Sequence, residues 1–189
     1  MNDELKLVKK AKQGDQHAFG KLVQQYQNKI LYLAFDLVGN YTDAQDIAQN
    51  TFLQAFKNIA YFRDEASFST WIYRIATNAA IDFQRSRKRR RQIFINQSKY
   101  EDEDSPYLEN IADPDVSIIK NLEDHDLKKL IADLVEQLSP QQRAAFMLKF
   151  FHDKKTDEIA EIIDCNPATV RGHLLRATTK LRKMLKDER

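Results

Sequence analysis

Apolar residues recur at intervals of three and four along most of the chain, which is the period of an amphipathic helix. The first such stretch, residues 19–37, predicts one long helix that ends at Gly39, a usual C-cap residue. A second helix is expected from Thr42, where Thr-Asp-Ala-Gln has capping-box form. Its expected buried stripe consists of Ile47, Ala48, Thr51, Phe52, Ala55 and Phe56. A third helix is expected to start within residues 67–70 and to run into the basic segment 85–91.

The C-terminal part of the chain carries clear helix-start signals. The sequence Ser-Pro-Gln-Gln at 139–142 places a serine cap before a proline at the first helical position, with a glutamine to complete the capping box. A short helix is expected from a cap at Thr156 to Ile163, followed by a turn of residues 164–166. Asn-Pro at 166–167 then starts another helix by the same logic. Helix, three-residue turn and helix together predict a helix-turn-helix.

Composition supports an all-α fold. The chain has only 4 glycines and 4 prolines among 189 residues, with 42% hydrophobic and 31% charged residues, which suits neither an all-β nor a disordered protein. No stretch has the roughly 18 apolar residues that span a bilayer, and the N-terminus lacks a signal-peptide core, so we expect a cytoplasmic location. The single cysteine, Cys165, is expected to be half-buried between helices. No cofactor and no metal site are expected.

Charge is segregated along the chain. Residues 1–91 carry 15 Lys and Arg against 9 Asp and Glu, residues 92–126 carry 2 against 10, and residues 127–189 carry 13 against 9. The two basic blocks suit a polyanionic partner, because each bound phosphate releases counterions. Residues 92–126 also lose helical periodicity, so they are expected to be a flexible acidic linker of at most about 115 Å. The prediction is two small helical domains, residues 1–91 and 127–189, which can engage separate sites.

The second helix of a helix-turn-helix enters the major groove with its N-terminal half facing the bases. Here Val170 and Leu174 begin the expected packed face. The residues left for bases and phosphates are Thr169, Arg171, Gly172, His173, Arg176 and Lys180. His173 contacts a phosphate, a base or neither. The alternative for the whole segment is an ordinary helical hairpin with a solvated basic face.

Two long strings resemble a known family. Asp-Ala-Gln-Asp-Ile-Ala-Gln-Asn-Thr-Phe at 43–52 and Phe-Ser-Thr-Trp-Ile-Tyr-Arg-Ile-Ala-Thr-Asn-Ala-Ala-Ile-Asp at 68–82 resemble region 2 of the extracytoplasmic-function (ECF) group of bacterial sigma factors. Leu-Ser-Pro at 138–140, Asp-Glu-Ile-Ala at 157–160 and Pro-Ala-Thr-Val-Arg at 167–171 resemble region 4 of the same group. The resemblance implies a non-enzymatic subunit that carries core RNA polymerase to promoter DNA and opens the minus-10 duplex.

The resemblance also implies partners and residue roles. The partners are the clamp helices and the flap of core polymerase, promoter DNA and an anti-sigma factor, without membrane insertion. The residues implied to bind the polymerase clamp are Asp43, Asp46, Gln49 and Asn50. Those implied to bind minus-10 DNA are Tyr61, Phe62, Arg63, Asp64, Ser67, Phe68, Trp71, Arg74, Asn78, Asp82 and Arg85, with a core position as the equal alternative for Trp71. Those placed on phosphates, or at the helix C-terminal dipole, are Arg87, Lys88, Arg89 and Arg90.

The pattern departs from the family in the recognition helix. Family members often carry Gly-Thr and Ser-Arg pairs where this chain has Ala168-Thr169 and Gly172-His173, so the minus-35 sequence stays open. A stand-alone repressor or activator, with residues 1–91 as a dimerisation domain, is the rival class. A regulator of that class gives no functional explanation for the polar face at 43–50 or for the aromatic loop at 61–68. A nucleic-acid enzyme fits less well, because no phosphate-binding glycine loop or nucleophile-base pair is present.

Overall fold

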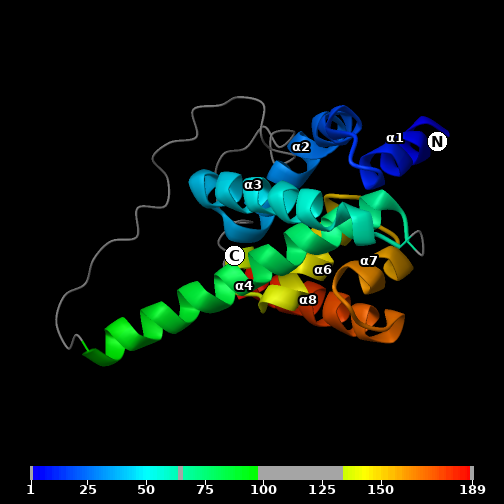
Figure 1. Cartoon of the computed structure of the whole chain (residues 1–189). Coiled ribbons are helices and arrows are strands. Elements are labelled where there is room, and N and C mark those ends of the chain that lie inside the picture. The colour runs from blue at the N-terminus through cyan, green and yellow to red at the C-terminus, as the bar shows by residue number, and fades with distance from the viewer. Residues whose placement is uncertain (1, 64–65, 98–133, 188–189) are drawn as a thin grey trace, which may run out of the picture.

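The computed structural model describes residues 2–63, 66–97 and 134–187, and every regular element within these ranges is helical (Figure 1). The all-α class is therefore confirmed. The elements are α1 (Asn2–Lys12), α2 (Gln16–Val38), α3 (Tyr41–Asn58), η1 (Ile59–Tyr61), α4 (Phe68–Gln97), α6 (Pro140–Phe150), α7 (Thr156–Ile162) and α8 (Pro167–Asp187). None of the helices in these ranges is both long and apolar enough to cross a membrane.

The junction between α2 and α3 confirms one expected cap and corrects another. Gly39 ends α2 with a left-handed φ of 76°, and its N–H donates to the Phe35 carbonyl. The prediction of a cap at Thr42 was wrong, because α3 is capped by Asn40, whose Oδ1 accepts from the Asp43 N–H at 3.0 Å. Asn40 is already extended directly after Gly39, so an Asn cap satisfies the first turn two residues earlier.

Helix α1 was not expected from the sequence. It has few apolar residues, but Val8 and Ala11 are buried in the domain core. The Tyr26 hydroxyl on α2 donates to the Glu4 carboxylate at 2.8 Å. A helix of 11 residues is marginal alone in water, so tertiary packing stabilises α1.

Helices α2, α3 and α4 form the core of the N-terminal domain. Fully buried residues on α2 and α4 include Leu22, Ile30, Leu33 and Ile72. The predicted stripe of α3 is buried at Ile47, Ala48, Thr51 and Ala55, and half-buried at Phe52. Placing Phe56 in that stripe was wrong: it is 46% exposed, with its ring edge against Phe19 at a centroid distance of 5.1 Å. It lies in the last turn of α3.

The C-terminal domain consists of α6, α7 and α8 on a small core that includes Leu148, Ile159, Ile162 and Val170. The Ser139 capping box and Pro140 are confirmed at the start of α6, as is the Asn166 cap of α8, whose Oδ1 accepts from the Thr169 N–H at 2.7 Å.

The start of the short helix α7 differs from the prediction. Thr156 is the first helical residue and the cap position is Lys155, whose N–H donates to the Glu158 carboxylate at 2.8 Å. A carboxylate three residues on can satisfy the cap N–H without a hydroxyl at the cap itself. The helix ends at Ile162, so the turn before Pro167 has one residue more than predicted.

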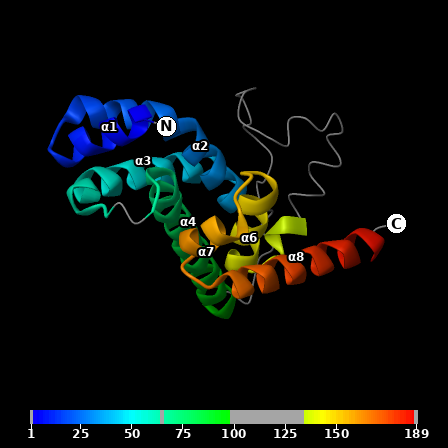
Figure 2. The ribbon, with the colours of Figure 1, turned by 90° about the vertical axis from the view of Figure 1, so that its right-hand side faces the viewer.

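Helix α4 lies between the two groups of helices, with α1–α3 on one side and α6–α8 on the other (Figures 1 and 2). The domains are in contact: α6 packs on α2 and α4, and α7 packs on α4. The predicted linker start at residue 92 was wrong, because α4 continues to Gln97. Residues 85–97 contain no glycine or proline to stop the helix. The rest of that linker lies outside the described residues.

Candidate nucleic-acid interface

A groove of about 670 Å³ opens where the start of α4 meets α7. One wall comes from η1, the loop after it and the first turns of α4, and consists of Tyr61, Phe62, Arg63, Ala66, Thr70, Trp71 and Arg74. The other wall comes from α7 and the turn before α8, and consists of Asp157, Ala160, Glu161, Asp164, Cys165 and Pro167. Most residues that the sequence assigns to minus-10 DNA at 61–74 therefore lie together on one wall.

Aromatic rings shape the N-terminal wall. Trp71 packs on Phe62 and Phe68 at centroid distances of 4.9 and 5.7 Å, and these two phenylalanines are buried. Trp71 itself is half-buried and also lines the groove. Its position is compatible with both predicted roles, as a core residue and as a DNA contact. Phe68 does not line the groove and supports Trp71 from the core. Tyr61, at 81% exposed, presents a ring to solvent at the groove edge.

The loop between η1 and α4 contributes one exposed cation and one helix cap. Arg63 is exposed at the groove. The Ser67 hydroxyl accepts from the Thr70 N–H at 3.0 Å, so this side chain begins α4 and holds the first turn in place. Asp64 lies outside the described residues.

The expected polar stripe on α4 is exposed along its whole length. Arg74, Asn78, Asp82 and Arg85 follow one another at about one helical turn. Arg74 Nη2 lies 3.1 Å from Asp164 Oδ1 across the groove, whereas Arg85 Nη1 lies 3.5 Å from Asp82 Oδ1 on its own helix. A second hollow of about 310 Å³ adjoins this stripe at Asn78 and Asp82.

The basic run that follows the stripe is largely exposed. Lys88, Arg89 and Arg90 are exposed and Arg87 is half-buried. The structure extends α4 past this run, so these cations lie along the helix and not in its last turn. A charge inside a helix interacts little with the helix dipole, so of the two predicted roles the phosphate role fits the geometry better.

The N-terminal half of helix α8 presents two exposed arginines, Arg171 and Arg176. Thr169 directs its hydroxyl to the Asn166 cap oxygen at 3.0 Å, and Lys180 donates to the Gln137 carbonyl near the start of α6. A methyl group at Gly172 would meet nothing within 4 Å, so no residue of the described chain requires a glycine there.

His173 on α8 is half-buried, and its Nδ1 has no hydrogen-bond partner among the described residues. Burial, followed by the nearby Arg176 charge, holds the pKa of His173 below its usual value. A pKa lowered from 6.5 leaves this imidazole neutral at pH 7. Of its open roles, a charged contact to phosphate is therefore the least favoured.

Helix α3 carries the predicted polymerase surface. Asp46, Gln49 and Asn50 are exposed, while Asp43 is half-buried in the first turn. Sequence reasoning missed Leu53, which is 51% exposed and lies one turn beyond Gln49 and Asn50. A leucine outside the buried stripe of an amphipathic helix was the signal that could have found it.

These features define a protein that is helical throughout its described residues, with an aromatic and basic groove wall on one domain and a helix-turn-helix on the other. Family models for sigma-70 region 2 and sigma-70 region 4 match residues 22–90 and 128–181. The chain is 35% identical over 186 residues to the ECF RNA polymerase sigma factor SigW of Bacillus subtilis (strain 168), covering 96% of both. It is 31% identical over 173 residues to the ECF RNA polymerase sigma-E factor of Haemophilus influenzae, covering 90% of this chain and 89% of the other. The chain belongs to the ECF group of sigma-70 family RNA polymerase sigma factors, which are not enzymes.

Two solved structures have the same fold. The chain of CnrH in complex with the cytosolic domain of CnrY matches with a TM-score of 0.71 at 22% identity, covering 100% of both chains. The sigma factor RpoE in complex with the anti-sigma factor NepR from Bartonella quintana matches with a TM-score of 0.62 at 21% identity, covering 90% of this chain and 98% of that chain.

Proposed function

We propose that this sigma factor brings core RNA polymerase to promoters that carry a minus-10 and a minus-35 element. The observation that carries the proposal is the placement of two different DNA-facing surfaces on two domains, each matching its own sigma-70 region. The first is the aromatic and basic wall of the groove, and the second is the exposed side of α8.

The groove wall suits single-stranded DNA at the minus-10 element. Trp71 offers a partly exposed ring that is held by Phe62 and Phe68, and a flipped base can stack on such a ring. Arg63 and the stripe from Arg74 to Arg85 then contact the backbone and the edge of the duplex, and the run from Arg87 to Arg90 binds further phosphates. Stabilising an unstacked base favours the opened duplex, which accounts for melting without an energy source.

The recognition helix suits the major groove of the minus-35 element. Its N-terminal half carries the exposed Arg171, which can pair with a guanine edge, and Thr169 and His173 flank it. Gly172 and His173 occupy positions where the family often has other residues, so the element read here differs from that of most relatives. Arg176 and Lys180 extend the contact toward phosphates.

Helix α3 is proposed to bind the clamp helices of the largest polymerase subunit through Asp43, Asp46, Gln49 and Asn50. The exposed Leu53 adds an apolar anchor beside these polar side chains, which is the composition of a protein interface. The C-terminal domain would contact the polymerase flap. We place this activity in the cytoplasm, where polymerase and chromosome meet.

An anti-sigma factor is the proposed inhibitor. The Bartonella quintana RpoE, which shares the fold of this chain, was solved in complex with the anti-sigma factor NepR, and CnrH, of the same fold, with the cytosolic domain of CnrY. The expected partner covers the surfaces that bind polymerase.

In vitro transcription tests this function. Purified chain and bacterial core polymerase are incubated with a library of genomic promoters, and the RNA starts are mapped. We expect new starts that share two upstream elements. The Arg171→Ala variant should lose starts that depend on the minus-35 element by about tenfold, the scale of one bidentate base contact.

The matched control is Arg182→Ala, because Arg182 is also an exposed arginine of α8 but lies far from its N-terminal half. It should initiate like the parent chain. Specific promoter binding by the chain alone, with no starts added to core polymerase, would instead establish a stand-alone regulator.

A further inference from the structure

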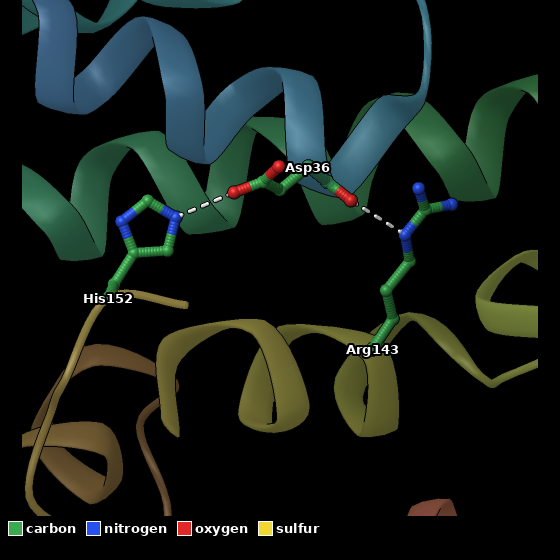
Figure 3. Close-up of polar contacts among 3 residues, drawn as sticks. All are labelled: Asp36, Arg143 and His152. Carbon is green, nitrogen blue, oxygen red and sulfur yellow. Dashed lines mark hydrogen bonds and ion pairs between the residues drawn. The ribbon is translucent and has the colours of Figure 1, made fainter. Parts of the chain in front are cut away.

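The contact between the two domains is centred on Asp36, near the end of α2. His152 Nε2, just after α6, lies 2.9 Å from Asp36 Oδ2, and the Arg143 Nε on α6 donates to the Asp36 carbonyl oxygen at 3.0 Å (Figure 3). The Asp36 and His152 side chains are only 3% and 5% exposed. Because an ionised carboxylate only accepts hydrogen bonds, the imidazole donates in this pair.

A buried carboxylate needs a partner, and this one finds its partner in the other domain. Asp36 interrupts the apolar segment 33–38 of α2, whose other members pack into the N-terminal core or at its edge. A carboxylate in such surroundings is costly unless it is hydrogen-bonded. In Figure 3 the carboxylate is met by His152, two residues after the end of α6, and the main-chain carbonyl of Asp36 by Arg143 of α6, both more than a hundred positions away. The N-terminal domain is therefore built to receive the C-terminal domain at this point.

Three further contacts hold the loops on either side of α7 against α4. Lys154 Nζ donates to the Ser69 hydroxyl at 3.2 Å and lies 4.2 Å from the centroid of the Tyr73 ring. Burial lowers the pKa of Lys154 and raises that of Tyr73 to about 12, as expected for groups enclosed between two domains. The third contact is the ion pair between Arg74 and Asp164.

Closure places acidic side chains opposite the minus-10 wall. The same approach that brings His152 to Asp36 places Asp157, Glu161 and Asp164 across the groove from Arg63 and Arg74. DNA phosphates entering this groove would meet three carboxylates, and Arg74 already has an acidic neighbour. The minus-10 wall and Pro167, the first residue of α8, also border one groove, so the closed chain cannot place its two surfaces on two separated promoter elements.

We propose that Asp36, His152 and Arg143 form a latch that holds the chain in a closed conformation in which the acidic side chains of α7 face the minus-10 wall across the groove. The inhibitory effect of closure on transcription rests on the proposed function. The closed conformation itself can be measured without DNA. Opening of this latch is a step in promoter recognition. The segment between α4 and α6 has contour length enough to let the domains separate.

The first experiment measures closure in the chain alone. Donor and acceptor dyes are placed at the exposed positions Lys57 on α3 and Lys183 on α8, in a Cys165→Ser background. Single-molecule energy transfer should show a compact main population for the parent. His152→Ala should raise the ratio of open to closed molecules about tenfold, because it leaves a buried carboxylate without its donor.

Two variants separate the latch from general unfolding. His17→Ala removes an exposed histidine of α2 and should leave the distribution unchanged. His152→Gln keeps an N–H donor and should restore much of the closed population. Unchanged energy transfer in His152→Ala, with retained helicity by circular dichroism, would overturn the latch.

The second experiment tests the consequence. Ser69→Cys and Lys154→Cys, again with Cys165→Ser, are joined by a reductant-cleavable thiol crosslinker across the interface. The crosslinked chain should lose at least tenfold of its starts with core polymerase, and reduction should restore them. Equal starts before and after reduction would overturn the inhibitory role of closure. No starts from either the reduced chain or the parent would instead count against the proposed sigma function itself.

Discussion

The two surfaces proposed to face DNA are built in different ways. The surface on α4 rests on buried aromatic rings and lies across a groove from α7, with Arg74 paired to Asp164. The surface on α8 begins at the Asn166 cap and packs on the C-terminal core through Val170, and its exposed Arg171 and Arg176 do not line that groove. We therefore expect closure to act more on minus-10 recognition than on the minus-35 surface.

The largest expected effect comes from Trp71. In the Trp71→Ala variant we expect promoter opening to fall by roughly tenfold or more, because stacking of one base on an aromatic ring contributes about 1–3 kcal/mol. The measurement is permanganate reactivity of minus-10 thymines with core polymerase. Phe83→Ala is the matched control, since Phe83 is also a half-buried aromatic residue of α4 packed on the core, but does not line the groove. Equal loss of reactivity in both variants would mean that Trp71 acts only through packing and does not contact the minus-10 DNA.

An intermediate effect is expected from the helix caps, which exist in both domains. Asn166 accepts from Thr169, and Asn40 accepts from Asp43, so each substitution to alanine removes a comparable bond. Each should destabilise its own helix by about 1 kcal/mol, measured by hydrogen exchange of α8 and α3. Only Asn166→Ala should weaken footprint protection of the minus-35 element. Loss of that protection in Asn40→Ala would mean that the two surfaces are not independent.

The smallest expected effect concerns His173. Because the pKa of His173 is lowered in the folded chain, the unfolded chain binds more protons at this residue than the folded chain does. His173 therefore lowers the free energy of unfolding as the pH falls through about 6.5, the ordinary pKa of a histidine in an unfolded chain. The His173→Gln variant should lose this sensitivity while holding minus-35 affinity within about twofold at pH 7.5. The comparison uses thermal unfolding from pH 5.5 to 7.5 together with DNA-binding titrations. A large loss of affinity at pH 7.5 would show that His173 reads a base.

Much of the fold could be predicted because several helix boundaries depend only on residues next to them in the sequence. Gly39, Ser139 with Pro140, and Asn166 with Pro167 each mark a helix end through their own backbone preferences. The misplaced caps at Thr42 and Thr156 share one cause: a neighbouring side chain satisfied the same backbone groups first. Helix α1 escaped prediction because its stability comes from packing on α2 and not from its own pattern.

The sequence indicated which residues belong to the candidate site, but not which neighbours surround them in the fold. The sequence pointed to residues 61–85 and 169–180, and the exposure of Arg63, Asn78 and Arg171 agrees with that expectation. It did not indicate that Ser67 caps α4 or that Phe68 lies in the core behind Trp71. Spacing along a helix tells which face a residue occupies, whereas the depth of a ring depends on helices from elsewhere in the chain.

The sequence by itself determined all the described helices but α1 and the short η1, together with the helix-turn-helix and the family, since these depend on short-range periodicity, caps and two long motifs. Only the tertiary structure decided how the two domains meet. In the sequence His152 is one of four histidines, and Asp36 is the single charge within the apolar segment 33–38. Folding places them 2.9 Å apart and out of water. The physical reason is that a buried charge is compensated by whatever the fold brings next to it, and that partner lies more than a hundred residues away.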